Sequence, residues 1–153
     1  MKIEFKKASL KDIADMQKLI QPEVESGIIL ARTNDEIATN IRSYILAYLE
    51  DNLVGFCALH IHTASLAEIR SLIVKESVRG QKVGENLVKK SLEEAKKLSL
   101  KKVLSLTYKQ SFFERLDFVE IPKESIPEHK IWADCIKCKH FPVCNEVSLI
   151  KTL

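Results

Sequence analysis

The most specific chemistry in the sequence lies in a loop made of Arg79, Gly80, Gln81, Lys82, Val83 and Gly84. The residues before this loop favour a strand, and those after it have the period of an amphipathic helix. A helix N-terminus leaves backbone N–H groups unpaired and carries the positive end of the helix dipole. The two glycines allow close approach to the backbone, and Arg79 and Lys82 add charge. The loop therefore predicts a pyrophosphate site, although an ordinary strand–helix connection fits the same residues.

Four metal-ligating side chains gather near the C-terminal end, namely Cys135, Cys138, His140 and Cys144. Three thiolates and an imidazole match the ligand count of a closed tetrahedral zinc site. Three cysteines also suit an iron–sulfur cluster, His129 is an alternative to His140, and free thiols in a loop remain a third interpretation. The sequence predicts a metal site, with structural Zn²⁺ favoured, in a cysteine-rich segment at 132–146.

Composition narrows the class of protein. The 153 residues, 46% hydrophobic and 29% charged, suit one domain with one core. No apolar run approaches the roughly 20 residues of a membrane span, and the N-terminus is too polar for a signal peptide. A net charge of +3 from interspersed residues does not argue for nucleic acid. Clustered cysteines without a targeting segment predict a reducing, cytoplasmic location.

Hydrophobic periodicity predicts the elements that must position the loop. We expect helices over 10–20, 35–43, 84–98 and 111–116, and strands over 3–5, 44–50, 53–61, 67–74, 102–106, 118–121 and 146–151. Ser9 caps the first helix, Thr33 or Asn34 caps the second, and Pro22 breaks the chain between them. The first four strands pair as a meander, and the helix at 84–98 then requires a crossover. We therefore predict an α/β fold with a mixed, mostly antiparallel sheet flanked by helices.

Residues 76–106, followed by 111–118, resemble the acetyl-CoA-binding half of the GNAT family of N-acetyltransferases. Arg79 and Gly84 match the ends of the family's R/Q-x-x-G-x-G/A loop, and Lys82 stands at its inner glycine. The family's F-Y-E-K-x-G-F pattern appears at 112–118, with Phe113 in place of the usual tyrosine. The resemblance implies a GNAT fold and acetyl-CoA as co-substrate.

The same resemblance implies roles for individual residues at the cofactor. The loop at 79–84 and Phe113 are expected to hold CoA. The backbones of Ile73 and Val74 are expected at the pantetheine arm and the thioester oxygen, where an N–H group would stabilise the tetrahedral intermediate. Tyr108 is the expected acid for the leaving thiolate in place of the missing tyrosine, although a core or rim tyrosine fits equally well.

Several segments are similar to the acetyltransferase domain of bacterial N-acetylglutamate synthases, in a short form without the amino-acid-kinase domain. They include LIQPEVESGIILARTNDEI, VGFCALHIH and AEIRSLIV. That subfamily also accepts phenylalanine at the position of Phe113. Its Y-N-x-x-R-x-S element, whose arginine holds a glutamate carboxylate, is replaced here by Trp132, Ala133, Asp134 and the cysteines.

The resemblance also implies the groups that handle the acceptor. Glu68, the sole carboxylate in its apolar strand, would be the general base for the incoming ammonium group, with a salt bridge to Arg70 as the structural alternative. Arg32 would bind a substrate carboxylate in a planar fork, and Arg70 and Lys130 would engage a second one. Surface ion pairs are the alternative for each of these cations.

Together these features predict one N-acetyltransferase domain over 1–153 that acetylates the α-amine of L-glutamate by direct attack. The product, N-acetylglutamate, would enter arginine biosynthesis. The alternatives are another amine, carried by an amino acid, a polyamine or a protein, and a non-catalytic CoA-binding or metal-sensing module. We expect a small-molecule substrate and neither nucleic acid nor membrane as partner, with a homodimer left open. Cys57 is expected in the core.

Overall fold

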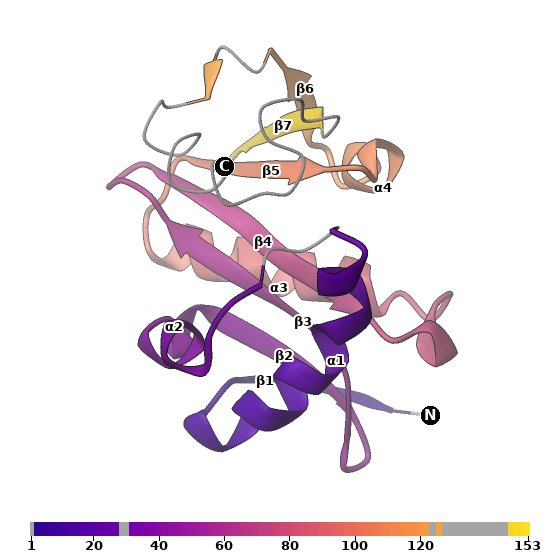
Figure 1. Ribbon diagram of the computed structural model, residues 1–153. Helices are drawn as coiled ribbons and strands as arrows, with labels where there is room; N and C mark the ends of the chain where they lie inside the picture. Colours follow the sequence, from indigo (N-terminus) through magenta and orange to yellow (C-terminus); the bar gives the residue numbers. More distant parts are fainter. Residues whose placement is uncertain (1, 28–30, 123–124, 127–146) are drawn as a thin grey trace.

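The computed structural model describes residues 2–27, 31–122, 125–126 and 147–153, whose centre is one mixed sheet (Figure 1). The strands are β1 (Ile3–Lys7), β2 (Tyr44–Leu49), β3 (Asn52–Ile61), β4 (Leu66–Val74), β5 (Lys102–Thr107), β6 (Val119–Ile121) and β7 (Val147–Thr152). The helices are α1 (Ile13–Glu25), α2 (Asn34–Thr39), α3 (Val83–Lys97) and α4 (Gln110–Glu114). Short 3-10 turns are η1 (Leu10–Asp12), η2 (Ile41–Ser43) and η3 (Glu76–Val78).

The strands are arranged in the order β1-β2-β3-β4-β5-β7-β6. Among the described strands every neighbouring pair is antiparallel except β4 and β5, which run parallel. Parallel neighbours need a long crossover, and α3 supplies it. The predicted meander, crossover and mixed sheet are therefore confirmed. None of the helices in the described ranges combines the length and the apolar character needed to cross a membrane.

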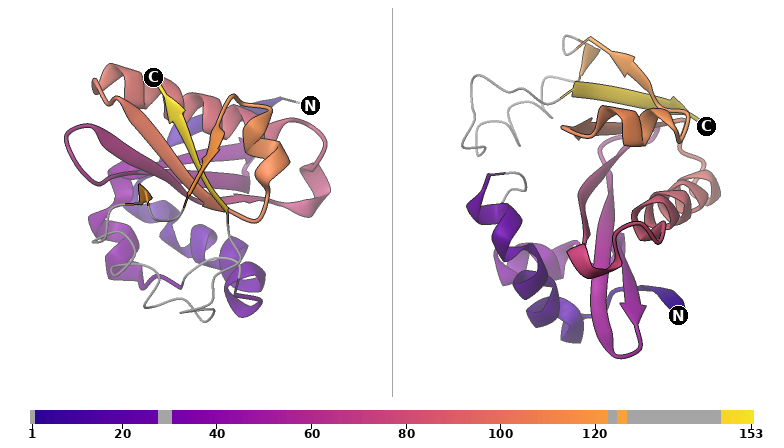
Figure 2. Two further views of the ribbon diagram at one scale, coloured as in Figure 1. Left: turned by 90° about the horizontal axis from the view of Figure 1, so that it is seen from above. Right: turned by 90° about the vertical axis from the view of Figure 1, so that its right-hand side faces the viewer.

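Helices cover both faces of the sheet, with α1 and α2 on one face and α3 on the other (Figure 2). On the α3 face, Cys57, Leu87 and Val103 lie at the centre of one hydrophobic core. On the opposite face, Met16 and Phe56 belong to a second core. Successive residues of a strand point to opposite faces of the sheet. Alternate residues of each strand therefore pack against α3 or against α1 and α2.

The first predicted helix begins at Leu10 as the 3-10 turn η1, continues as α1 and ends later than expected. The Ser9 backbone N–H and hydroxyl donate to the Asp12 carboxylate at 2.8 and 3.0 Å, which confirms the cap. The break expected at Pro22 is wrong, because α1 continues to Glu25. A proline costs one helical hydrogen bond. Val24, two residues later, packs against the core on this face, which favours continuation of the helix past Pro22.

The second predicted helix is shorter than expected and is followed by a separate 3-10 turn, η2. Of the two predicted caps it is Thr33 that acts, since its hydroxyl accepts from the Glu36 N–H at 3.1 Å and its own N–H donates to the Glu36 carboxylate. Asn40 ends α2 because its side-chain amide donates to the Glu36 carbonyl at 2.9 Å. This competition between side chain and backbone separates α2 from η2.

Gly55 lies on β3 where that strand and the end of β4 approach each other closely. A Cβ at Gly55 would lie 2.9 Å from the Ile73 carbonyl oxygen, which is backbone and cannot move aside. We expect Gly55→Ala to reduce the free energy of unfolding by about 1–3 kcal/mol, the usual cost of overpacking. Thermal unfolding checks this. Gly84→Ala is the matched control, because its nearest contact is a side chain at 3.4 Å. Equal melting temperatures for the two variants would contradict the expectation.

Candidate active site

The parallel strands β4 and β5 separate in the middle of the sheet, as Figure 1 shows. They are paired only from Leu66 with Lys102 to Ile69 with Ser105. Beyond that point β4 continues to Val74 against β3, and β5 continues to Thr107 against β7. Backbone groups of residues 70–74 that point away from β3 therefore have no strand partner among the described residues. Such an opening between parallel strands exposes hydrogen-bonding backbone to a ligand.

A β-bulge lies in β4 at the same place. Phe56 pairs with Ile73 and Ala58 with Arg70, so two β4 residues stand opposite Cys57. One of them, Ser71, has φ 53°, in the left-handed region. Bulges of this kind redirect the strand and are frequent next to active sites. Sequence reasoning missed this bulge, because serine is not a residue that favours positive φ.

The predicted cofactor loop joins η3 to α3. Gly80 has φ 90° and open space around its α-carbon, and Lys82 has φ 61°. The position of the family's inner glycine is thus a left-handed one, which Lys82 adopts with its side chain exposed. In the described part of the chain no carbonyl accepts from the N–H groups of residues 82–85. These donors and the helix dipole make the loop suitable for a phosphate group.

Two residues tie the loop to the end of β4. The Arg79 Nε donates to the Val74 carbonyl at 3.3 Å, so the arginine links the loop to the strand that follows the bulge. A Cβ at Gly84 would lie 3.4 Å from the Val74 side chain and 3.5 Å from the Phe112 ring. The loop, Ile73 and Val74 therefore lie together, as the proposed cofactor roles require.

Phe113, which we expected at the cofactor, is 2% exposed. Its ring packs edge-on against Phe112 at 5.0 Å and Phe118 at 5.1 Å, inside the core under α3. Contact with a bound cofactor would require this ring to be uncovered. Its neighbour Phe112 is the ring that approaches the start of α3.

Glu68 is buried on the face of the sheet that α1 and α2 cover, one residue before β4 and β5 separate. Its Oε1 accepts a hydrogen bond from the Arg70 Nε at 3.1 Å and lies 2.8 Å from the His62 Nε2. The ion pair with Arg70 is therefore present, and it holds the carboxylate within the site. Sequence reasoning did not single out His62, although a short β3–β4 turn brings these residues together.

The positive charges of Arg32 and Arg70 both act on the buried hydroxyl of Tyr44. Tyr44 on β2, Ala58 on β3 and Arg70 on β4 are in register across three strands. Burial raises the pKa of the Tyr44 hydroxyl above its usual value, and the charges of Arg32 and then Arg70 oppose this rise. The two predicted carboxylate ligands thus lie on one face of the sheet. The Arg32 carbonyl also accepts from the Gln17 side chain at 2.7 Å, which fixes the backbone there.

The remaining predicted residues fall into two groups. Tyr108 follows β5, past the strand separation, and is 44% exposed. The substrate candidate and the four metal candidates lie outside the described residues: Lys130, Cys135, Cys138, His140 and Cys144. Within the described ranges no group of His, Cys, Asp or Glu side chains is arranged to hold a metal ion. The metal site in the cysteine-rich segment stays a prediction.

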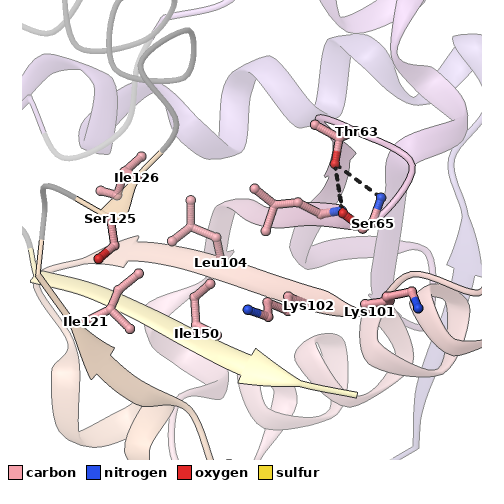
Figure 3. A pocket seen from close by; sticks show the side chains of 10 residues that line it. Thr63, Ser65, Lys101, Lys102, Leu104, Ile121, Ser125, Ile126 and Ile150 are labelled. Atoms are coloured by element: carbon pink, nitrogen blue, oxygen red, sulfur yellow. Dashed lines mark hydrogen bonds between the residues drawn. The ribbon is translucent and has the colours of Figure 1, made fainter.

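A pocket of about 410 Å³ has the β3–β4 turn and Leu66, at the start of β4, in its wall (Figure 3). Leu104, directly opposite Glu68 in register, is part of its wall, as are Ile121 and Ile150. Lys101 and Lys102 also line it. The lining is therefore part aliphatic and part polar, and the two lysines are its cations.

Cys57 is fully buried, which confirms its predicted place in the core. Its Sγ lies 3.2 Å from the Ser91 hydroxyl. Burial raises the pKa of the thiol to about 11, so at neutral pH it carries almost no thiolate. Cys57 is therefore unsuited to act as an acetyl-accepting nucleophile.

Comparison with known proteins identifies the family. Residues 10–118 match the model of the acetyltransferase (GNAT) family. The chain belongs to this family. An N-acetyltransferase of Chlorobaculum tepidum, described as uncharacterized, is 35% identical over 95% of this chain and 94% of its own length. The chain is thus a GNAT N-acetyltransferase, as its sequence predicted.

More distant relatives carry a more specific name. The amino-acid acetyltransferase of Aeromonas salmonicida is 25% identical over 76% of this chain, but the match spans 28% of that protein. The N-acetylglutamate synthase of Neisseria gonorrhoeae, solved with coenzyme A and N-acetylglutamate, superposes with a TM-score of 0.90 at 22% identity. That match covers all of this chain and 35% of the synthase. At this level of identity the superposition shows the shared GNAT fold.

Proposed function

We propose that this protein transfers the acetyl group of acetyl-CoA to the α-amine of L-glutamate, the first step of arginine biosynthesis, in the cytoplasm. The observation that carries the proposal is the buried Glu68 carboxylate, which is hydrogen-bonded to Arg70 where β4 and β5 separate, on the side where the charge of Arg32 also acts on Tyr44. A base next to two cations suits an acceptor that has both an ammonium group and carboxylates. The amino-acid acetyltransferases and the N-acetylglutamate synthase to which the chain is similar support the same acceptor.

Acetyl-CoA fits the opening between β4 and β5. The N–H groups of residues 82–85 and the charge of Arg79 would hold its pyrophosphate. Backbone groups of Ile73 and Val74, which follow the bulge, would bind the pantetheine arm and the thioester oxygen. An N–H directed at that oxygen stabilises the negative charge of the tetrahedral intermediate.

Glu68 would start the reaction by taking one proton from the substrate ammonium group. The free amine then attacks the thioester carbon, a C–N bond forms, and the C–S bond breaks. The CoA thiolate takes up a proton, for which Tyr108 is the candidate donor. The new amide nitrogen loses its second proton, which restores the Tyr108 hydroxyl, and Glu68 releases the first proton to solvent. Both substrates would be bound together, and Cys57, which is buried with a raised thiol pKa, would take no part as an acetyl-accepting nucleophile.

Arg32 and Arg70 would bind the carboxylates of the acceptor. A guanidinium forms two parallel hydrogen bonds with a carboxylate, which fixes the acceptor as well as attracting it. Arg70 donates a hydrogen bond to Glu68, and its charge also acts on the Tyr44 hydroxyl. Arg70 would therefore link the base to the carboxylate site. Lys130 is a further candidate from the sequence.

A substrate panel tests the proposed function. CoA release from acetyl-CoA is measured with the common amino acids and with polyamines, leaving any bound metal in place. We expect the highest kcat/KM with L-glutamate. A tenfold higher kcat/KM with another amine would show that glutamate is not the acceptor, although the acetyl-transfer reaction would stand. No turnover with acetyl-CoA still bound would favour a protein amine or the non-catalytic module.

Arg32→Ala tests carboxylate recognition. A lost charge-assisted hydrogen bond costs about 1.5–3 kcal/mol, so the KM for L-glutamate should rise by about tenfold or more. The KM for acetyl-CoA should change little, because the cofactor loop is a separate element. Arg42→Ala, which removes an exposed arginine of η2, is the control. A rise in the glutamate KM of less than about threefold would remove Arg32 from the substrate site.

A further inference from the structure

His62 is the residue whose chemistry the proposed function leaves unused. It follows β3, and its side chain is 5% exposed, as buried as that of its partner Glu68 at 4%. The distance from His62 Nε2 to Glu68 Oε1 is 2.8 Å, shorter than the 3.1 Å of the Arg70 contact to the same oxygen. A second histidine, His60, packs its ring edge-on against His62 at 4.8 Å.

The β3–β4 turn holds His62 in this position. Its backbone N–H donates to the Leu66 carbonyl at 2.9 Å. The Thr63 hydroxyl accepts from the backbone N–H groups of Ser65 and Leu66 at 3.2 and 3.0 Å. His60 and Glu68 face each other across the two strands, so His62 is the diagonal neighbour of Glu68. The contact is therefore built into the hairpin.

The partners of the shared oxygen determine the direction of this hydrogen bond. The Arg70 guanidinium can only donate, which keeps Glu68 in the role of an ionised acceptor. A carboxylate has no hydrogen to give, so His62 must donate from Nε2. We therefore assign the Nε2–H tautomer to His62, with its ring as a fixed donor to Glu68.

We propose that His62 is the positioning residue of Glu68: its Nε2–H fixes the plane of the carboxylate toward the acceptor ammonium group. This inference rests on the proposed role of Glu68 as the base. The terminal torsion of a glutamate is soft, and small errors in base position cost large factors in rate. In the reaction Glu68 receives the ammonium proton, and His62 keeps its own proton throughout.

Two substitutions of His62 separate positioning from packing. His62→Leu removes the donor, and we expect kcat to fall by about 10- to 100-fold with both KM values within about twofold. His62→Gln places an amide N–H near the position of Nε2, and we expect it to restore kcat to within about threefold of the parent enzyme. A Gln variant as slow as the Leu variant, or a Leu variant with unchanged kcat, would overturn the proposal.

Thr63→Val is the matched structural control. It removes hydrogen bonds from the same turn without removing the donor to Glu68. We expect Thr63→Val to lower the melting temperature and to change kcat little. If Thr63→Val reduces kcat as much as His62→Leu does, His62 acts by holding the turn, and the positioning role is wrong.

A double-mutant cycle links His62 to Glu68. Because His62 acts through Glu68, adding His62→Leu to Glu68→Gln should reduce kcat by less than about twofold further. Additive losses would contradict the proposal. The cycle uses whichever amine the enzyme acetylates fastest, so a failure of the glutamate assignment does not affect it.

Ring ¹⁵N spectra of His62 provide a readout that does not depend on turnover. We expect a protonated Nε2 whose resonance shifts in Glu68→Gln. A protonated Nδ1 with a bare Nε2 would overturn the assignment of the donor. This result is distinct from a failure of the proposed function, which the substrate panel reveals by the absence of acetylation.

Discussion

The separation of β4 from β5 is the constraint on which the site depends. Because α3 must cross over to reach β5, the two strands run parallel, and they remain paired only as far as Ile69 and Ser105. A fully paired sheet would leave no backbone donors in its middle. Here the bulge at Ser71 and the close approach at Gly55 hold the last residues of β4 beside the start of α3. Backbone donors and a helix N-terminus thus share one opening.

The second principle of the site is a buried charge cluster. Burying a carboxylate is costly unless it is paired and hydrogen-bonded, and Glu68 satisfies this with Arg70 and His62 on one oxygen. The same contacts that make burial tolerable also hold the carboxylate in one place. Side chains alternate between the two faces along each strand, and the strand register brings Glu68, Arg70 and Tyr44 to the same face. Stability and chemistry therefore depend on the same few contacts.

Sequence periodicity predicted the meander of the first four strands, the crossover and a helix cap at Thr33 or Asn34, because these follow from local pattern and short connections. It failed at Pro22, where packing of Val24 outweighed the intrinsic preference of proline. It also missed the bulge at Ser71 and the contact of His62 with Glu68. No residue type in this part of β4 marks the bulge. Predicting the His62–Glu68 contact requires the hairpin register together with the alternation of side chains along β3. Family resemblance supplied the expected roles of Glu68, Arg32 and the cofactor loop, which local pattern alone does not assign.

The most direct test of this account is steady-state kinetics of Glu68→Gln. General-base catalysis contributes about 10²- to 10⁴-fold, so kcat should fall by at least about 100-fold while both KM values stay within about threefold. Glu93→Gln, an exposed carboxylate of α3, should keep full activity. A Glu68→Gln enzyme that turns over within about threefold of the parent, with an unshifted pH profile of kcat/KM, would contradict the account.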